Sequence, residues 1–306
     1  VYTAAQGRQV VDFSARRAHG GPASLLCARA AVVGGCVGTS NTLAGQMYGI
    51  GTYGTQAHSW IMAYDNEADA FGHFLDTFPA GAVLLVDTYN VRKAVKTIIA
   101  MDRKPAGIRL DSGDLCADSR WARRELDRAR WNDVKIFASG DLDEYKIASL
   151  LRDGAAIDAF GVGAALGTPA DAPHLNLIYK LVEVERGGEI REAAKFSRSK
   201  VTYPGRKQVF RHSNTRGELL SDKIAIEDEP SNGGEPLLIQ VMRGGRRAVP
   251  KEPLTKLRER CIANLARLPK RNLLLNRSAV YPVRYSQNLK SMLERVRRRV
   301  QHSAVK

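Results

Sequence analysis

The first 190 residues alternate short apolar segments with helix-like stretches, and this alternation constrains the fold more than any other feature. Strands are predicted at 10–13, 37–39, 51–53, 83–87, 108–111, 135–139, 159–161 and 179–185. Helices are predicted between them, at 89–101, 119–130 and 143–151. About eight strand–helix units imply an α/β fold with a parallel sheet, and so short a chain fits an irregular (β/α) barrel better than an open sheet.

Length and charge predict a second region past residue 190. The chain has 306 residues, and that length favours roughly two domains. Residues 1–190 hold 20 basic and 22 acidic residues, whereas residues 191–306 hold 27 and 10, so the net charge of +15 lies in the second part. We therefore expect domains at 1–190 and 191–306. The basic part could bind nucleic acid or phosphate-rich ligands, but a solvated surface explains it more simply, and nucleic acid is an unlikely partner.

The basic region also differs in its pattern. Short antiparallel strands are expected at 200–209 and 237–241, with glycine-rich turns at 187–188, 233–234 and 244–245. A closing helix is expected at 286–302, where Leu289, Met292, Leu293, Val296 and Val300 share one face. We therefore expect an α+β region that follows the barrel.

Several classes of protein are excluded by composition. No apolar run approaches the roughly 20 residues that a membrane span needs, because Arg29 interrupts the best candidate. The four cysteines form no CxxC pair and are too sparse for a disulfide scaffold, so a reducing, cytoplasmic location is expected. The first residues contain neither an initiator Met nor a signal peptide, and we interpret the start as a truncation.

Polar residues and glycines gather at the carboxyl ends of the predicted strands, which is where parallel barrels build their active sites. Arg109 and Asp111 are the most informative pair, because strand alternation points both side chains to the same face. The guanidinium could pair with Asp111 inside the barrel or bind a ligand carboxylate or phosphate with its planar fork. Asp111 and Asp114 could hold ribose hydroxyls or a Mg²⁺ ion that already carries phosphates.

Two further segments are weaker signals on their own. His58 lies between small residues at a strand-to-helix junction, where a neutral imidazole could act as base or nucleophile, or could simply begin a helix. The glycines of 139–141 and 160–163 come late in the barrel, where backbone N–H groups often bind phosphate. Tight turn packing is the common alternative for such glycines.

Taken together and in order, these motifs resemble the nicotinate phosphoribosyltransferases, the type II phosphoribosyltransferases of NAD salvage. The resemblance runs from about Val10 to about Val184 and continues more loosely through 200–210. Its motifs are DFSARR at 12–17, GTSN at 38–41, LAG at 43–45, GTQAHS at 54–59, LVDTY at 85–89, RLDSGD at 109–114, SGD at 139–141, FGVG at 160–163 and YKLV at 179–182.

The resemblance implies a barrel joined to the C-terminal part of an α+β sandwich domain. It also implies a reaction in which nicotinate and phosphoribosyl pyrophosphate give nicotinate mononucleotide and pyrophosphate, helped by ATP and Mg²⁺, in a homodimer. His58 matches the histidine that ATP phosphorylates, and we expect Asp111 to be a second catalytic residue. Residues matching substrate-binding positions are Phe13, Thr55 and Arg109 for nicotinate, and Arg16, Ser40, Asn41, Asp111, Gly140, Asp141, Gly161, Gly163 and Ala164 for ribose and phosphates.

Two residues depart from the family pattern: Ser14 replaces a usual glycine, and Ala164 replaces a frequent Thr or Ser of the phosphate loop. A larger departure concerns the family's N-terminal segment, which is not found here. In the family this segment supplies a Tyr that covers the nicotinate ring. Two alternatives therefore stay open beside the nicotinate enzyme. One is a nicotinamide phosphoribosyltransferase, and the other is a truncated, inactive paralogue that only binds ligands.

Overall fold

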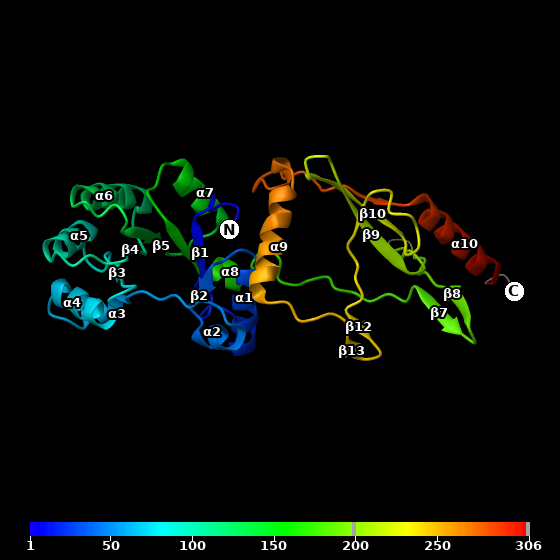
Figure 1. Cartoon of the computed structure of the whole chain (residues 1–306), viewed down its shortest axis with the longest axis horizontal. Coiled ribbons are helices and arrows are strands. Elements are labelled where there is room, and N and C mark those ends of the chain that lie inside the picture. The colour runs from blue at the N-terminus through cyan, green and yellow to red at the C-terminus, as the bar shows by residue number, and fades with distance from the viewer. Residues whose placement is uncertain (198–199, 304–306) are drawn as a thin grey trace. The chain divides into compact units, whose positions relative to one another are not determined.

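The computed structural model describes residues 1–197 and 200–303, and the chain divides into two compact units (Figure 1). The first unit comprises Val1–His174 and Glu252–Ile262. The second comprises Leu175–Lys251 and the chain from Ala263 onward. The boundary that charge places near residue 190 stays a prediction. No helix among the described residues is long and apolar enough to cross a membrane.

A six-stranded parallel sheet forms the centre of the first unit, and it curls as a half-barrel with helices around it (Figure 1). Its order is β2-β1-β6-β5-β4-β3. The strands are β1 (Gln9–Asp12), β2 (Gly38–Thr39), β3 (Val83–Leu85), β4 (Gly107–Leu110), β5 (Lys135–Ala138) and β6 (Ala159–Val162). The helices are α1 (Gly21–Val33), α2 (Thr42–Tyr48), α3 (His58–Met62), α4 (Glu67–Thr77), α5 (Val91–Ala100), α6 (Leu115–Arg128), α7 (Glu144–Arg152) and α8 (Ala164–Gly167). The predicted α/β fold class is confirmed.

Two of the eight predicted strands do not join this sheet, so the expected count was too high. The segment 51–53 contributes one isolated bridge, between Thr39 and Thr52. The segment predicted at 179–185 supplies only its end to an antiparallel hairpin, formed by β7 (Glu183–Arg186) and β8 (Glu189–Glu192). In that hairpin Gly187 and Gly188 both have positive φ, so a tight local turn is favoured over a long-range parallel pairing.

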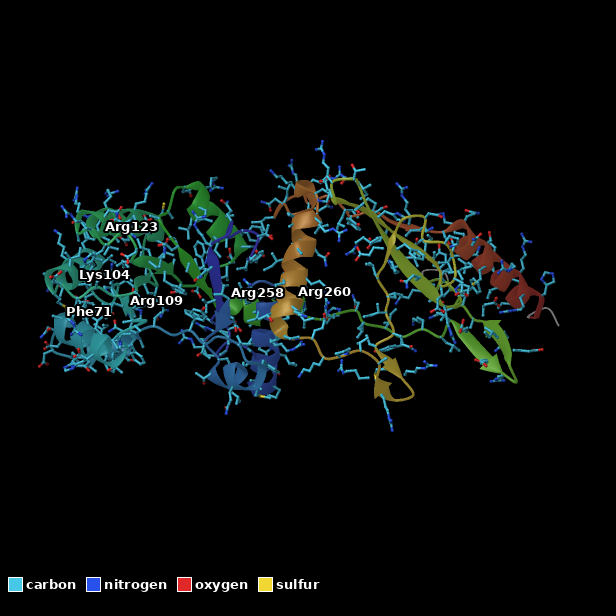
Figure 2. All side chains as sticks on the ribbon, viewed as in Figure 1. Phe71, Lys104, Arg109, Arg123, Arg258 and Arg260 are labelled. Carbon is cyan, nitrogen blue, oxygen red and sulfur yellow. The ribbon has the colours of Figure 1, made fainter. Side chains whose placement is uncertain are left out.

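Short polar side chains fix where the main helices begin. In α2, α4, α5, α6 and α7 an Asn or Asp at the N-cap accepts a hydrogen bond from the backbone N–H three residues on. The predicted apolar face of α5 is confirmed, with Val95 and Ile98 buried and Val91 and Ile99 packed beside them. At the other end of α6, Arg123 donates to the carbonyls of Trp131 and Val134 and so closes the loop before β5 (Figure 2).

Strand alternation sorts the side chains of the sheet between two faces. Ile108 and Leu110 of β4 are fully buried in the main core with Ile136 of β5, beneath the surrounding helices. Arg109 lies between the first two in sequence and therefore faces the concave side of the sheet. There it is in register with Leu85 and Phe137 of the neighbouring strands. The alternation thus places a cation on the concave face of the sheet, between two apolar neighbours.

The second unit is built on a mixed sheet of order β11-β9-β10-β14. Its strands are β9 (Lys207–Ser213), β10 (Leu219–Ile226), β11 (Glu235–Pro236) and β14 (Val283–Tyr285), with a separate hairpin of β12 (Met242–Arg243) and β13 (Arg246–Arg247). The helices are α9 (Leu254–Arg267), which begins in the first unit, the 3₁₀ helix Lys270–Asn272, and α10 (Gln287–Ser303). This sheet and helix agree with the α+β character expected for the C-terminal region.

An ion pair and one helix face organise the second unit. Arg211 and Asp222 form two hydrogen bonds of 3.0 and 2.9 Å across β9 and β10. The predicted closing helix is confirmed, and four of its five apolar residues are buried, whereas Val300 is exposed. The strand expected at 237–241 does not form, and β9 begins later than the strand expected at 200–209.

Ser14 provides a test of packing in the first unit. Its side chain is fully buried against Gly167, and its hydroxyl has no hydrogen-bond partner among the described residues. An unpaired buried hydroxyl is destabilising, so Ser14→Ala should raise the free energy of unfolding by about 1 kcal/mol. Ser119 is a matched control, because it is equally buried but its hydroxyl bonds Cys116 and Ala156.

Urea unfolding of both variants measures the difference. Ser119→Ala should lower the free energy of unfolding by about 1–2 kcal/mol, opposite in sign to Ser14→Ala. A loss of stability in Ser14→Ala comparable to that in the control would show that the Ser14 hydroxyl has a partner.

Candidate functional site

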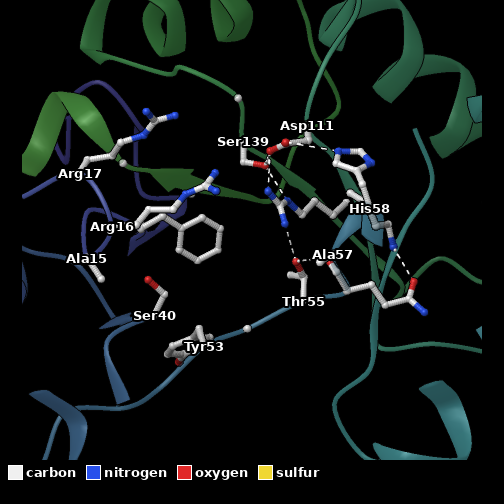
Figure 3. Close-up of a pocket in the computed structure, with 18 of the residues that line it drawn as sticks. Ala15, Arg16, Arg17, Ser40, Tyr53, Thr55, Ala57, His58, Asp111 and Ser139 are labelled. Carbon is white, nitrogen blue, oxygen red and sulfur yellow. Dashed lines mark hydrogen bonds and ion pairs between the residues drawn. The ribbon is translucent and has the colours of Figure 1, made fainter. Parts of the chain in front are cut away.

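A cavity of about 720 Å³ opens at the carboxyl ends of the sheet strands in the first unit (Figure 3). All of the predicted catalytic and substrate-binding residues except Asn41 line it. Those residues are Phe13, Arg16, Ser40, Thr55, His58, Arg109, Asp111, Gly140, Asp141, Gly161, Gly163 and Ala164. The side chain of Asn41 instead caps α2 and donates a 2.5 Å hydrogen bond to Ser24.

Arg109 connects three segments of the cavity wall. Its Nε donates to Ser139 Oγ at 2.7 Å and its Nη1 donates to Thr55 Oγ1 at 2.7 Å. Its Nη2 pairs with Asp111 Oδ1 at 2.5 Å. The ion pair expected as one of two alternatives is therefore present, and it lies on the cavity wall. Since a guanidinium carries five N–H donors, two remain for a ligand.

The environment of Asp111 keeps its carboxyl group ionised. Burial raises its pKa, but the hydrogen bond from Ser139 Oγ and the charge of Arg109 outweigh burial, so the pKa lies below its ordinary value. His58 is the third neighbour, with Nε2 at 3.6 Å from Asp111 Oδ2. The imidazole Nδ1 lies 3.1 Å from Thr88 Oγ1. His58 is the first residue of α3, and its side chain is 41% exposed, so it is open to a ligand in the cavity.

Two glycines allow close approaches that no other residue would permit. Gly140 has a φ of 95°, and a Cβ there would lie 1.8 Å from the carbonyl oxygen of Asp111. The backbone of the 139–141 turn therefore passes directly against the β4 end. At Gly161 a Cβ would lie 2.6 Å from the ring of Phe13. This glycine makes room for the aromatic ring on the concave face.

Aromatic and cationic side chains share the remaining wall. The ring of Phe13 stacks on Phe137 at 5.6 Å between centroids, and the guanidinium carbon of Arg109 lies 5.6 Å from the Phe13 centroid. Arg16 and Arg17 also line this cavity (Figure 3). Both are exposed, and neither guanidinium has a hydrogen-bond or ion-pair partner within the described residues. The cavity therefore offers two unpaired cations beside an aromatic surface.

Sequence reasoning missed several contributors to the site. Arg17 and Tyr53 line the cavity, and Ser139 joins Arg109 to Asp111. Arg17 directly follows Arg16, and Ser139 begins the SGD motif at 139–141. Both could therefore have been found from their position in the chain next to predicted site residues. Tyr53 had no such signal, because the segment around it was taken for a strand of the barrel.

The cavity does not present a metal cage of its own. Within the described residues no group of three or more His, Cys, Asp or Glu side chains is placed to hold a metal ion. Asp111 is moreover engaged with Arg109 and Ser139. A Mg²⁺ site made of protein ligands alone does not fit these residues. The binding of ATP, and of Mg²⁺ carried by phosphates, stays a prediction.

The chain is similar to known proteins over nearly its whole length. The profile of the "Nicotinate phosphoribosyltransferase (NAPRTase) family" matches residues 8–221, and that of the "Nicotinate phosphoribosyltransferase C-terminal domain" matches residues 231–293. "Nicotinate phosphoribosyltransferase pncB2" of Mycobacterium tuberculosis is 42% identical over 305 residues, which cover 97% of this chain. The chain spans 64% of the length of that relative.

Two solved structures share the fold. The crystal structure of human nicotinic acid phosphoribosyltransferase superposes with a TM-score of 0.76 at 22% identity, covering 96% of this chain and 71% of the human one. That of a nicotinate-nucleotide pyrophosphorylase from Pyrococcus furiosus superposes with a TM-score of 0.71 at 28% identity, covering 86% and 67%. Both likenesses support the half-barrel with its C-terminal sheet region.

The link between Ser139 and Asp111 predicts a pH-dependent stability. Because the pKa of folded Asp111 is below its ordinary value of 3.8, this group stabilises the fold at neutral pH and loses that effect as pH falls through the folded pKa. Ser139→Ala removes a hydrogen bond to a charged group, and should cost about 1–3 kcal/mol at pH 7. The part of this stability loss that depends on pH should shrink below pH 3.8.

Carboxyl ¹³C NMR titration and urea unfolding at pH 7 and pH 3 check this expectation. The Asp111 carboxyl of Ser139→Ala should titrate at higher pH than in the parent protein. An unchanged Asp111 titration would mean that Arg109 alone holds the carboxylate ionised.

Proposed function

Because the chain belongs to the nicotinate phosphoribosyltransferase family, we propose that it transfers a phosphoribosyl group from phosphoribosyl pyrophosphate to nicotinate. The products are nicotinate mononucleotide and pyrophosphate. The observation that carries the proposal is the position of Arg109 on the cavity wall. Its guanidinium lies 5.6 Å from the Phe13 ring and is paired with Asp111, which in turn lies 3.6 Å from His58. The Arg109 cation thus shares the cavity wall with an aromatic surface, Phe13, and with a candidate nucleophile, His58.

Recognition of nicotinate follows from the unused capacity of Arg109. Thr55, Ser139 and Asp111 occupy three of its N–H groups, and the remaining donors can bind the substrate carboxylate. The pyridine ring would then lie against Phe13, where aromatic faces pack with offset stacking. Since Asp111 already balances one charge, the carboxylate would complete a hydrogen-bonded network.

Recognition of phosphates follows from two cations that have no partner among the residues that the structure describes. Arg16 and Arg17 can each bind phosphate oxygens with two parallel N–H donors. Gly140, Gly161 and Gly163 leave the cavity wall uncrowded, and Ser40 adds a hydroxyl. We infer that phosphoribosyl pyrophosphate lies across this part of the cavity, with its reacting carbon toward Phe13.

Coupling to ATP is proposed to run through His58. The imidazole is accessible, and a neutral ring is nucleophilic near pH 7. Mg²⁺ would enter with the phosphates of the substrates, since the described residues form no cage for it.

The assembly and compartment are proposals of the same kind. A homodimer is expected from the family, and a cytoplasmic location agrees with the four free cysteines.

Burial raises the pKa of the Cys36 thiol to about 12, so this cysteine stays protonated and unreactive.

The proposed coupling predicts a phosphorylated His58. Incubation of the 306-residue chain with γ-labelled ATP and Mg²⁺ should give acid-labile, base-stable label. The label should be lost in His58→Ala and kept in His73→Ala, because His73 stacks on Tyr64 outside the cavity. Label that persists in His58→Ala would sink the assignment.

The proposed recognition predicts a preference for the acid over the amide. With phosphoribosyl pyrophosphate present, calorimetry should show nicotinate binding at least about tenfold more tightly than nicotinamide, because a charge-assisted hydrogen bond is worth about 1.5–3 kcal/mol. Arg109→Gln should abolish most of this preference. Arg103→Gln, at an exposed ion pair with Asp76, should keep it.

Equal binding of the two ligands by the parent protein would favour the nicotinamide enzyme instead. Circular dichroism of Arg109→Gln separates a lost contact from a lost fold.

A further inference from the structure

Thr88 contacts the proposed nucleophile from outside the cavity. It lies three residues past the end of β3, and its Oγ1 lies 3.1 Å from Nδ1 of His58. His58 lines the cavity whereas Thr88 does not, so Nδ1 is turned toward the protein. The other ring nitrogen, Nε2, is turned toward Asp111 at the cavity wall (Figure 3).

We propose that Thr88 is a positioning residue that holds the proton of His58 on Nδ1, so that Nε2 is the atom that accepts the phosphoryl group. This inference rests on the proposed function, because it concerns the same histidine. It adds the identity of the reacting nitrogen and the residue that selects it.

The choice of tautomer is made at Nδ1 because the contact at Nε2 is not a hydrogen bond. Asp111 Oδ2 lies 3.6 Å from Nε2, which is beyond hydrogen-bonding distance. Asp111 Oδ1 accepts from both Arg109 and Ser139, so the carboxylate is already paired. The Thr88 hydroxyl is within range and can accept the Nδ1–H. A neutral imidazole bound in this way carries its lone pair on Nε2.

The position of Thr88 is itself fixed. The preceding residue, Asp87, accepts hydrogen bonds from the Asp111 N–H at 2.9 Å and from Ser112 Oγ at 2.6 Å. These bonds tie the end of β3 to the end of β4, where Leu85 is in register with Arg109. Both groups that flank the His58 ring therefore come from neighbouring strand ends that are held together.

The proposed step balances without a separate base. The Nε2 lone pair forms a bond to the γ-phosphorus of ATP, and the bond from that phosphorus to the bridging oxygen breaks. ADP leaves with the bonding electron pair. The ring proton stays on Nδ1, where Thr88 Oγ1 accepts its hydrogen bond, and the nearby Asp111 carboxylate offsets the positive charge that develops on the ring.

The first test compares two substitutions that differ in the hydroxyl. Thr88→Val keeps the shape and removes the hydroxyl, whereas Thr88→Ser keeps it. The initial rate of His58 labelling by ATP should fall roughly tenfold in Thr88→Val, the effect of about one lost hydrogen bond, and should be largely retained in Thr88→Ser. Thr77→Val, whose hydroxyl bonds His73 in α4, is the matched control and should label at the parent rate.

The second test reads the ring directly and needs no nucleotide. In ¹⁵N-histidine NMR spectra the neutral ring of His58 should show a protonated Nδ1 and an unprotonated Nε2 in the parent protein and in Thr88→Ser. Thr88→Val should shift the ring toward the other tautomer. A merely structural role for Thr88 would leave this signature unchanged.

The outcomes separate the two proposals. A parent protein with its proton on Nε2, a label on Nδ1, or a Thr88→Val variant that labels at the parent rate would each overturn the role of Thr88. A parent protein that ATP does not label refutes the proposed coupling instead. The tautomer measured by NMR still decides the position of the proton in that case.

Discussion

The contact between Arg109 and Asp111 is the interaction on which the rest of the site depends. The two side chains are 16% and 25% exposed, so each charge is largely withdrawn from water and needs its partner. Ser139 and Thr55 satisfy the other sides of the guanidinium, and they come from the end of β5 and from the loop before α3. One cation thereby fixes the loop that carries His58 against two strands. A lysine could not do this, because it lacks the planar fork.

Local patterns in the sequence were enough to predict much of the fold. The apolar faces of α5 and α10 depend on residues a few positions apart, and both helices were predicted correctly. Strand pairing depends on distant partners, which is why the segment 51–53 was wrongly counted as a strand of the barrel. At 237–241 the apolar run remains exposed at Leu238 and Ile239, so hydrophobicity there does not indicate a core strand.

The same limit applies to the site. The residues proposed to carry the chemistry, such as His58 and Arg109, could be named from the sequence because they lie in motifs that resemble those of a known family. Supporting residues could not. Gln56 is 1% exposed, and its side chain bonds the N–H of Leu85 and the carbonyl of Ala70. Within the motif it is only a polar residue, and nothing local shows that it anchors the loop that carries His58 to the edge of β3.

The departures at Ser14 and Ala164 bear on how the cavity holds anions. Ser14 has its hydroxyl buried against Gly167, outside the cavity, so it cannot replace the hydroxyl that is missing at Ala164. In the proposed function, anion binding therefore depends more on Arg16 and Arg17, which no group in the described chain neutralises. Because both are exposed, they remain hydrated until a ligand arrives and carry little desolvation penalty beforehand. Arg109 is the opposite case, since it is partly buried, and it is paired before any substrate binds. The cavity thus joins a rigid cation suited to a small planar carboxylate to two adaptable cations suited to a flexible phosphate chain.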